Sequence, residues 1–175
     1  MNAEQQVDVV DVVDECDRVL TQAAREEVRR RNLRHRSVYT LVFNSAGQLF
    51  VHQRTLTKDV YPGFWDATVS GVLAAGEGYD QGARRELREE LGITPIGLRR
   101  LFPVRYEDDA NRVIGMVYSC TAEGPFDLQA SEIVAGKWMD LDALVERTQW
   151  DRFCPDGLEA FRLYLSKLAA VRPAR

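Results

Sequence analysis

The stretch from Gly71 to Ile93 constrains the fold of this 175-residue chain more than any other segment, because it joins a glycine-punctuated loop to an amphipathic helix. Residues 79–91 are rich in strong helix formers, and Gly92 follows them where a left-handed residue commonly caps a helix. An apolar stripe at helical spacing runs along the same residues, formed by Ala83, Leu87 and Leu91. The segment therefore predicts a loop followed by a helix that packs on a core through one face.

Three glutamates share another face of this predicted helix. Glu86, Glu89 and Glu90 stand at i, i+3 and i+4, within an arc of about 100°. Like charges on one face are unfavourable unless neighbouring arginines or bound divalent cations offset them. Carboxylate oxygens suit Mg2+ or Mn2+, but the i, i+4 pair of Arg85 and Glu89 would equally suit a solvated surface. The helix alone leaves both interpretations open.

The spacing upstream of the helix favours the metal site. The segment matches the pattern Gly-x5-Glu-x7-Arg-Glu-U-x-Glu-Glu-x-Gly-U, in which U is an aliphatic residue, at every specified position. From average residue frequencies, a chance match in a chain of this length has a probability on the order of one in ten million. This pattern resembles the Nudix box. The matching residues are Gly71, Glu77, Arg85, Glu86, Leu87, Glu89, Glu90, Gly92 and Ile93.

The resemblance implies an α/β protein with the Nudix fold, in which a mixed β-sheet is sandwiched between α-helices. It also implies that Glu86, Glu89 and Glu90 hold Mg2+, or Mn2+, with Glu89 and Glu90 taking part in catalysis. In this family the box hydrolyses a nucleoside diphosphate linked to another group. A divalent cation suits that chemistry, because it neutralises the crowded charge of a diphosphate and lowers the pKa of an attacking water.

Other residues of the box match family positions that have a structural role. The resemblance implies that Glu77 and Arg85 pair and fix the loop on the helix, and that Gly71 and Gly92 are also structural. The reaction further needs a carboxylate as a base. Glu132 stands where several relatives place one, although an exposed loop glutamate is the alternative.

The similarity extends beyond the box to isopentenyl-diphosphate isomerases and to the uncharacterised Nudix hydrolases close to them. In that group the equivalents of Arg54 and Lys58 contact diphosphate, as two cations beside a Pro-Gly loop can do. The segments that carry this similarity are Leu33-Arg34-His35-Arg36, Gln53-Arg54, residues 58–65 and Arg105-Tyr106.

The chain departs from the isomerases at the residues that isomerisation needs. Isomerases have a Cys-Gly-His segment that supplies a protonating thiol and a metal-binding imidazole, whereas this chain has Ser70-Gly71-Val72. The predicted function is therefore a Mg2+-dependent hydrolase that cleaves a small-molecule diphosphate by water attack. An isopentenyl-diphosphate isomerase and a nucleotide-sensing Nudix binding module are the alternatives, and His35 is interpreted as structural.

The rest of the chain is consistent with a single domain over residues 1–175, comprising an N-terminal extension (1–34), a core (35–150) and a C-terminal helix (151–175). Residues 7–21 suggest a short hairpin, and residues 64–69 are expected to be extended. The hairpin signal Asn44–Gly47 joins two further strands. The other expected strands are 37–43, 49–54, 98–106, 113–120 and 132–140, and the other expected helices are 22–33, 141–148 and 157–170.

The composition limits the kinds of molecule that the protein is expected to bind. With 23 Lys and Arg against 27 Asp and Glu, the net charge of −4 argues against a general nucleic-acid binder. Six arginines between Arg25 and Arg36 form a local basic stretch that is interpreted as a solvated helix face. The absence of a long apolar run or a signal peptide predicts no membrane association and a cytoplasmic protein, and the family resemblance allows a homodimer.

Overall fold

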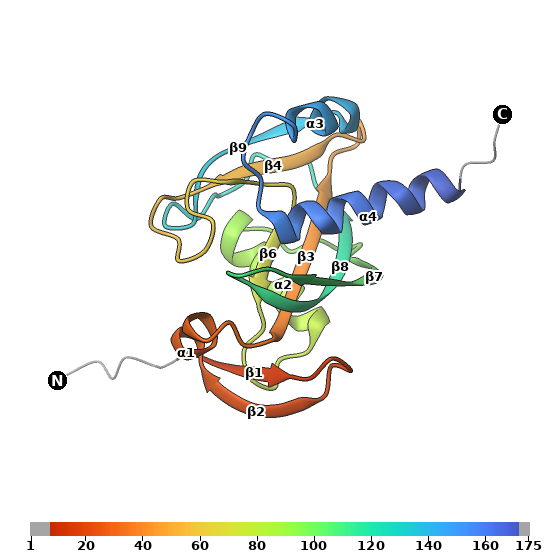
Figure 1. Ribbon diagram of the computed structural model, residues 1–175. Helices are drawn as coiled ribbons and strands as arrows, with labels where there is room; N and C mark the ends of the chain where they lie inside the picture. The colour runs from red at the N-terminus through yellow and green to blue at the C-terminus, as the bar shows by residue number, and fades with distance from the viewer. Residues whose placement is uncertain (1–7, 172–175) are drawn as a thin grey trace.

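The computed structural model describes residues 8–171, which form one nine-stranded mixed sheet with helices on both faces (Figure 1). The strands are β1 (Val9–Val13), β2 (Val19–Ala24), β3 (His35–Phe43), β4 (Leu49–Arg54), β5 (Trp65–Asp66), β6 (Val69–Val72), β7 (Arg99–Glu107), β8 (Arg112–Thr121) and β9 (Ile133–Met139). The helices are α1 (Arg25–Arg30), α2 (Tyr79–Leu91), α3 (Leu141–Arg147) and α4 (Pro155–Val171). None of the helices within residues 8–171 is long and apolar enough to cross a membrane.

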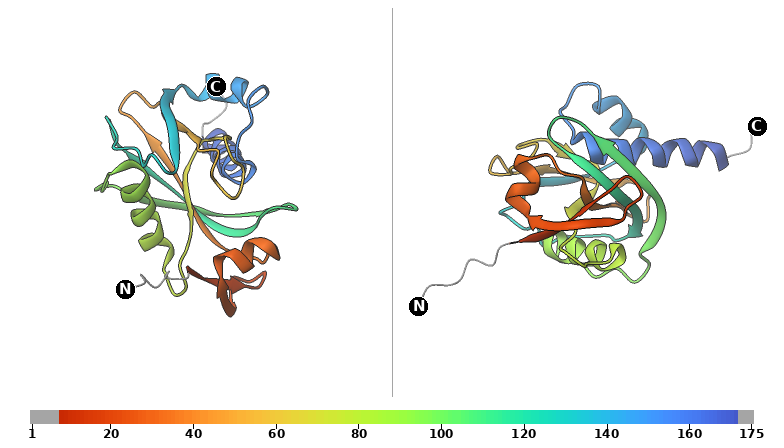
Figure 2. Two further views of the ribbon diagram at one scale, coloured as in Figure 1. Left: turned by 90° about the vertical axis from the view of Figure 1, so that its left-hand side faces the viewer. Right: turned by 60° about the horizontal axis from the view of Figure 1, so that its bottom comes forward.

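Strand β3 lies at the centre of the sheet, and its side chains alternate between the two helical layers. Tyr39 and Leu41 pack in one core cluster with Phe161 of α4, whereas Val38 and Val42 belong to the clusters formed with α2. Figure 2 shows α2 and α4 on opposite sides of the sheet. The predicted α/β fold, with a mixed sheet between helices, is thus confirmed.

The predicted β3–β4 hairpin is present, but its two strands separate soon after the turn. They pair only at Phe43 and Leu49, after which β3 pairs with β6 and β8 while β4 pairs with β5 and β9. The sheet therefore has two halves, which are joined through this turn. One half carries β6 and α2, and the other carries the β4–β5 loop and the start of β9.

Two of the predicted elements are wrong in their extent. The helix expected from residue 22 begins only at Arg25, because Gln22 pairs with Asp11 in the β1–β2 ladder and donates a 3.0 Å hydrogen bond to its side chain. The extended run expected over 64–69 is divided into β5 and β6, because Asp66 Oδ1 accepts hydrogen bonds from the backbone and hydroxyl of Thr68. The division into an extension, a core and a C-terminal helix stays a prediction, and its residues 1–7 and 172–175 lie outside the described part.

His35 begins β3 in a buried position, where protonation is unfavourable. Its side chain is 2% exposed, and Nδ1 lies 2.9 Å from the carbonyl oxygen of Leu33. Burial, together with the positive charge of Arg29, lowers the pKa of His35 to about 4 from its usual 6.5. The folded protein therefore holds this imidazole neutral at pH values where the unfolded chain would protonate it.

We expect His35 to make the protein sensitive to acid. Because the unfolded chain takes up the proton near pH 6.5 and the folded chain near pH 4, the stability present above pH 6.5 is lost as the pH falls through this window. The loss amounts to roughly 3 kcal/mol of unfolding free energy by pH 4. Urea unfolding of the wild type and His35→Gln between pH 7.5 and pH 4 measures it, and parallel pH profiles for the two proteins would contradict it.

Candidate active site

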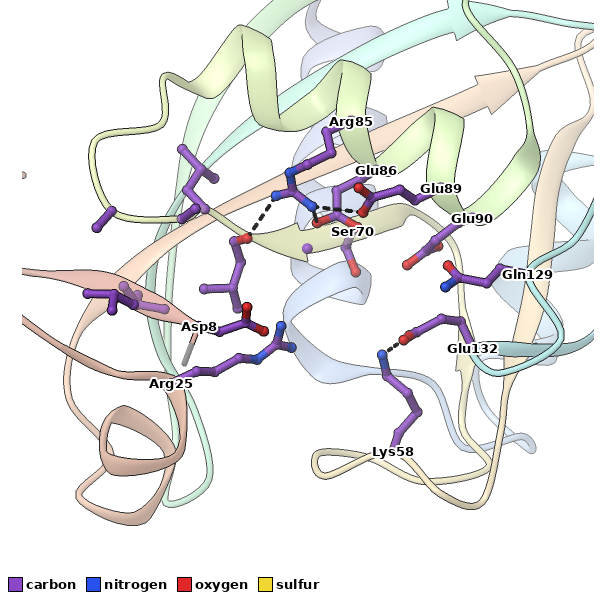
Figure 3. Close-up of a pocket in the computed structure, with 17 residues that line it drawn as sticks. Asp8, Arg25, Lys58, Ser70, Arg85, Glu86, Glu89, Glu90, Gln129 and Glu132 are labelled. Carbon is purple, nitrogen blue, oxygen red and sulfur yellow. Dashed lines mark hydrogen bonds and ion pairs between the residues drawn. The ribbon is translucent and has the colours of Figure 1, made fainter. Parts of the chain in front are cut away.

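A cavity of about 550 Å3 lies between α2, β6, β1 and the β4–β5 loop, and we call it the main cavity (Figure 3). A smaller recess of about 50 Å3 adjoins it, since residues including Lys58 and Ser70 line both. The fold places most of the predicted site residues around the main cavity and Arg54 in the recess. Those around the main cavity are Lys58, Gly71, Arg85, Glu86, Glu89, Glu90 and Glu132.

Arg85 fixes the loop on helix α2 through Glu77. Its Nε donates to Glu77 Oε1 at 2.8 Å, and its Nη2 donates to Glu77 Oε2 at 2.9 Å and to the carbonyl of Val72 at 3.1 Å. Burial would raise the pKa of Glu77, but hydrogen bonds from Arg85 and from the backbone of Ala74 lower it below its ordinary value. Gly92 ends the helix with φ 69°, a left-handed conformation that favours glycine.

The same guanidinium offsets two of the three glutamates. Arg85 Nη1 donates to Glu86 Oε1 at 2.6 Å and to Glu89 Oε2 at 3.0 Å. Within residues 8–171, no three His, Cys, Asp or Glu side chains already stand in the arrangement of a metal site. Arg85 occupies one oxygen of Glu86 and one of Glu89, which leaves Glu86 Oε2 and Glu89 Oε1 without a hydrogen bond from it.

Glu90 is the most deeply buried of the three glutamates. It is 4% exposed, and its Oε2 has no hydrogen-bond partner among the described residues. Burial, followed by the negative charges of Glu86 and Asp66, raises the pKa of Glu90 well above its ordinary value. The nearest imidazole nitrogen, His52 Nε2, lies 3.8 Å away, but burial lowers the pKa of His52 to about 3 and keeps it neutral.

Gly71 provides the room for the neighbouring carboxylate. A Cβ atom at this position would lie 1.9 Å from Glu86 Oε1, so only glycine allows the Glu86 carboxylate to occupy its place. The pKa of the buried Glu86 is also raised, chiefly by burial. A hard divalent cation fits this donor set, because it would supply the positive charge that the buried, unpartnered Glu90 oxygen lacks.

Lys58 and Glu132 form an ion pair on the side of the main cavity that faces the glutamates of α2 (Figure 3). Lys58 comes from the β4–β5 loop, and Glu132 immediately precedes β9. Both side chains are partly buried and Glu132 is paired, so Glu132 is not the exposed loop glutamate of the alternative interpretation. Burial, and then the charge of Arg54, lower the pKa of Lys58.

Two arginines that line the cavities were not among the predicted site residues. Arg25 of α1 lines both the main cavity and the recess, and Arg29 lines the recess. The interpretation of the basic stretch as a solvated face holds for Arg30 and Arg31, which are exposed, but is wrong for these two. The signal available in the sequence was the density of arginines, which does not reveal which side of a short helix faces a cavity.

Comparison with known proteins gives concordant matches. A family model described as NUDIX domain matches residues 33–157. An uncharacterised Nudix hydrolase of Yersinia pestis is 40% identical over 161 residues, which cover 92% of this chain and 87% of the relative. Another uncharacterised Nudix hydrolase, from Pseudomonas aeruginosa, is 43% identical over 153 residues, which cover 87% of this chain and 90% of the relative. The crystal structure of DR0079 from Deinococcus radiodurans is similar with a TM-score of 0.78 and 28% identity, covering 88% of this chain and 97% of that one.

Proposed function

Because this chain belongs to the Nudix hydrolase family, we propose that it cleaves the diphosphate link of a nucleoside diphosphate derivative or a related small organic diphosphate, with the help of Mg2+ or Mn2+. Enzymes of this family hydrolyse phosphoanhydride bonds and generally need a divalent metal. The observation that carries the proposal is the cavity in which the unpaired Glu90 carboxylate faces the cationic Lys58. A site for a diphosphate needs both kinds of side chain, since carboxylates can hold the metal ion and a lysine can bind phosphate oxygens.

In this proposal Glu86, Glu89 and Glu90 hold the metal. A bound divalent cation would supply positive charge to the diphosphate and lower the pKa of the attacking water. Arg85, which donates to both Glu77 and Glu86, keeps the helix and its loop in register while the carboxylates bind. The raised pKa values of Glu86 and Glu90 mean that protons compete with the metal for these groups more than they would for exposed carboxylates.

The remaining residues act on the substrate and on water. Lys58 and Arg54 neutralise the phosphate oxygens, and Glu132 accepts a proton from the attacking water. The water oxygen bonds to phosphorus while the bond from phosphorus to the bridging oxygen breaks, and the leaving phosphate takes the bonding electrons. The ion pair with Lys58 holds the Glu132 side chain at the cavity.

The two alternative functions are not favoured. Ser70 Oγ donates a 3.2 Å hydrogen bond to Asp66, and the side chain of Val72 is apolar, so neither replaces the thiol and imidazole of an isomerase. A binding module would not need the complete set of glutamates that this site retains. Small-molecule diphosphates remain the partners, whereas the cytoplasmic location and a homodimer stay predictions.

We expect Mg2+ or Mn2+ to be required for turnover. Release of phosphate or nucleotide would be measured across nucleoside di- and triphosphates, nucleotide sugars, dinucleotides and prenyl diphosphates, with either metal and with EDTA. Hydrolysis of at least one class with metal, and its loss in EDTA, is the expected result. Conversion of isopentenyl to dimethylallyl diphosphate without hydrolysis, or binding of all these compounds without turnover, would contradict the proposal.

A further inference from the structure

Helix α1 directs two arginines towards the site. Arg25 lines both the main cavity and the recess, and Arg29 lines the recess. Both residues lie outside the segment that the family model matches, residues 33–157. They precede the matched segment, and the box does not account for them.

Both guanidinium groups retain unused hydrogen-bonding capacity. No hydrogen bond or ion pair joins the Arg25 guanidinium to another of the residues drawn in Figure 3. Arg29 Nε is buried and has no hydrogen-bond partner among the described residues, since the nearest carboxylate, Asp59, lies 3.6 Å away. Arg29 Nη1 donates to Asn111 Oδ1 at 2.9 Å, which holds the side chain in place. Buried donors of this kind are costly unless an acceptor reaches them.

Cations and carboxylates are mixed around the main cavity, since Arg85 contacts Glu86 and Glu89, Lys58 pairs with Glu132, and Asp8 lines the cavity together with Arg25. In Figure 3 Arg25 and Lys58 lie across the cavity from Glu86, Glu89 and Glu90. A diphosphate between these walls would face metal on one side and guanidinium or ammonium groups on the other. Arg25 would then bind phosphate oxygens that are turned away from the glutamates.

The recess is basic and small. Four cationic side chains line it, against the two carboxylates of Asp66 and Asp156. Those carboxylates already accept hydrogen bonds, Asp66 from Thr68 and Asp156 from Tyr39. The cations are Arg25, Arg29, Arg54 and Lys58.

The size of the recess determines what can reach Arg29. Its volume of about 50 Å3 is far below the about 300–1,000 Å3 of pockets for drug-sized ligands. A sugar or a second nucleoside does not fit there, but the oxygens of a terminal phosphate do. A terminal phosphate also carries a second negative charge at neutral pH, because its second pKa is about 6.

We infer that Arg25 and Arg29 select substrates whose diphosphate ends in a free phosphate group, with the organic part in the main cavity and the terminal phosphate at the recess. This inference rests on the proposed function and narrows its substrate class. Nucleoside diphosphates and other organic diphosphates are then preferred to nucleotide sugars and dinucleotides, in which both phosphates are esterified.

The test compares Arg25→Gln and Arg29→Gln with Arg30→Gln, which makes the same charge change on an exposed position of the same helix. For substrates with a terminal phosphate we expect each of the first two variants to lower kcat/KM about ten- to hundredfold, mainly through KM, and Arg30→Gln to leave it unchanged. Turnover of nucleotide sugars should change less than threefold in Arg29→Gln and Arg30→Gln, because Arg29 lines only the recess. Arg29→Lys should recover only part of the loss, because lysine lacks the guanidinium fork.

A binding measurement separates this inference from the proposed function. Calorimetric titration with methylenediphosphonate, a non-hydrolysable diphosphate with free phosphonate ends, should show affinity lost in Arg25→Gln and Arg29→Gln but not in Arg30→Gln. Thermal unfolding checks that the variants are folded. Equal kcat/KM and equal affinity in all the folded proteins, or a wild-type preference for nucleotide sugars, would overturn the inference while leaving hydrolysis intact. Absence of any metal-dependent hydrolysis would instead refute the proposed function.

Discussion

Glu90→Gln is expected to lower kcat about a thousandfold or more while leaving the fold intact. The carboxylate is buried and its Oε2 has no hydrogen-bond partner among the described residues, so its negative charge contributes nothing visible to folding. Glutamine has nearly the same shape but is a neutral and poor ligand for a hard cation. The melting temperature should stay the same or rise, because the substitution removes an uncompensated buried carboxylate.

Steady-state kinetics with Mg2+, together with thermal unfolding with and without Mn2+, measure both effects. The wild type should be stabilised by Mn2+ and the variant much less so, since a cation that binds only the folded state raises its stability. Glu146→Gln is the matched control, because Glu146 is exposed on α3 and lies far from the box in sequence. Full activity in Glu90→Gln would refute the metal assignment.

Gly71→Ala is the second substitution with a large expected effect. The new Cβ would lie 1.9 Å from Glu86 Oε1 and 2.0 Å from its Cδ, so the carboxylate has to leave its position. Because the end of a glutamate side chain can rotate away, the backbone of β6 should stay paired with β3 and folding should change little. A displacement of about 1 Å can cost about a hundredfold in rate, and we expect a loss of that size.

Gly97→Ala is the control for this substitution, because nothing lies within 4 Å of its Cβ position. Activity at saturating Mg2+ and a Mg2+ titration distinguish a displaced ligand from a damaged fold. Wild-type activity in Gly71→Ala would show that the position of the Glu86 carboxylate does not matter for turnover.

Local features of the fold could be predicted from the sequence. Helix α2 and its cap at Gly92 follow from spacing and propensity, which act over a few residues. The contacts of Arg85 with Glu86 and Glu89 could be anticipated in part, since the i, i+4 pair is visible in the sequence.

Features that depend on distant pairing could not be predicted in this way. Helix α1 begins at Arg25 because β2 continues through Gln22 in register with Asp11 of β1, a pairing that helix propensity does not reveal. That starting point decides which arginines turn towards the cavity. For the same reason Arg25 and Arg29 appeared in the sequence only as members of a basic stretch.

The single pairing of Phe43 with Leu49 has a consequence for how the substrate range of such an enzyme can diverge. The glutamates of α2 belong to the half of the sheet built on β3 and β6, and Lys58 belongs to the half built on β4 and β9. Insertions or substitutions in the β4–β5 loop can therefore reshape the mouth of the cavity without altering the strand pairs that seat the glutamates. The metal-binding carboxylates and the choice of substrate are thus free to evolve at different rates within one domain.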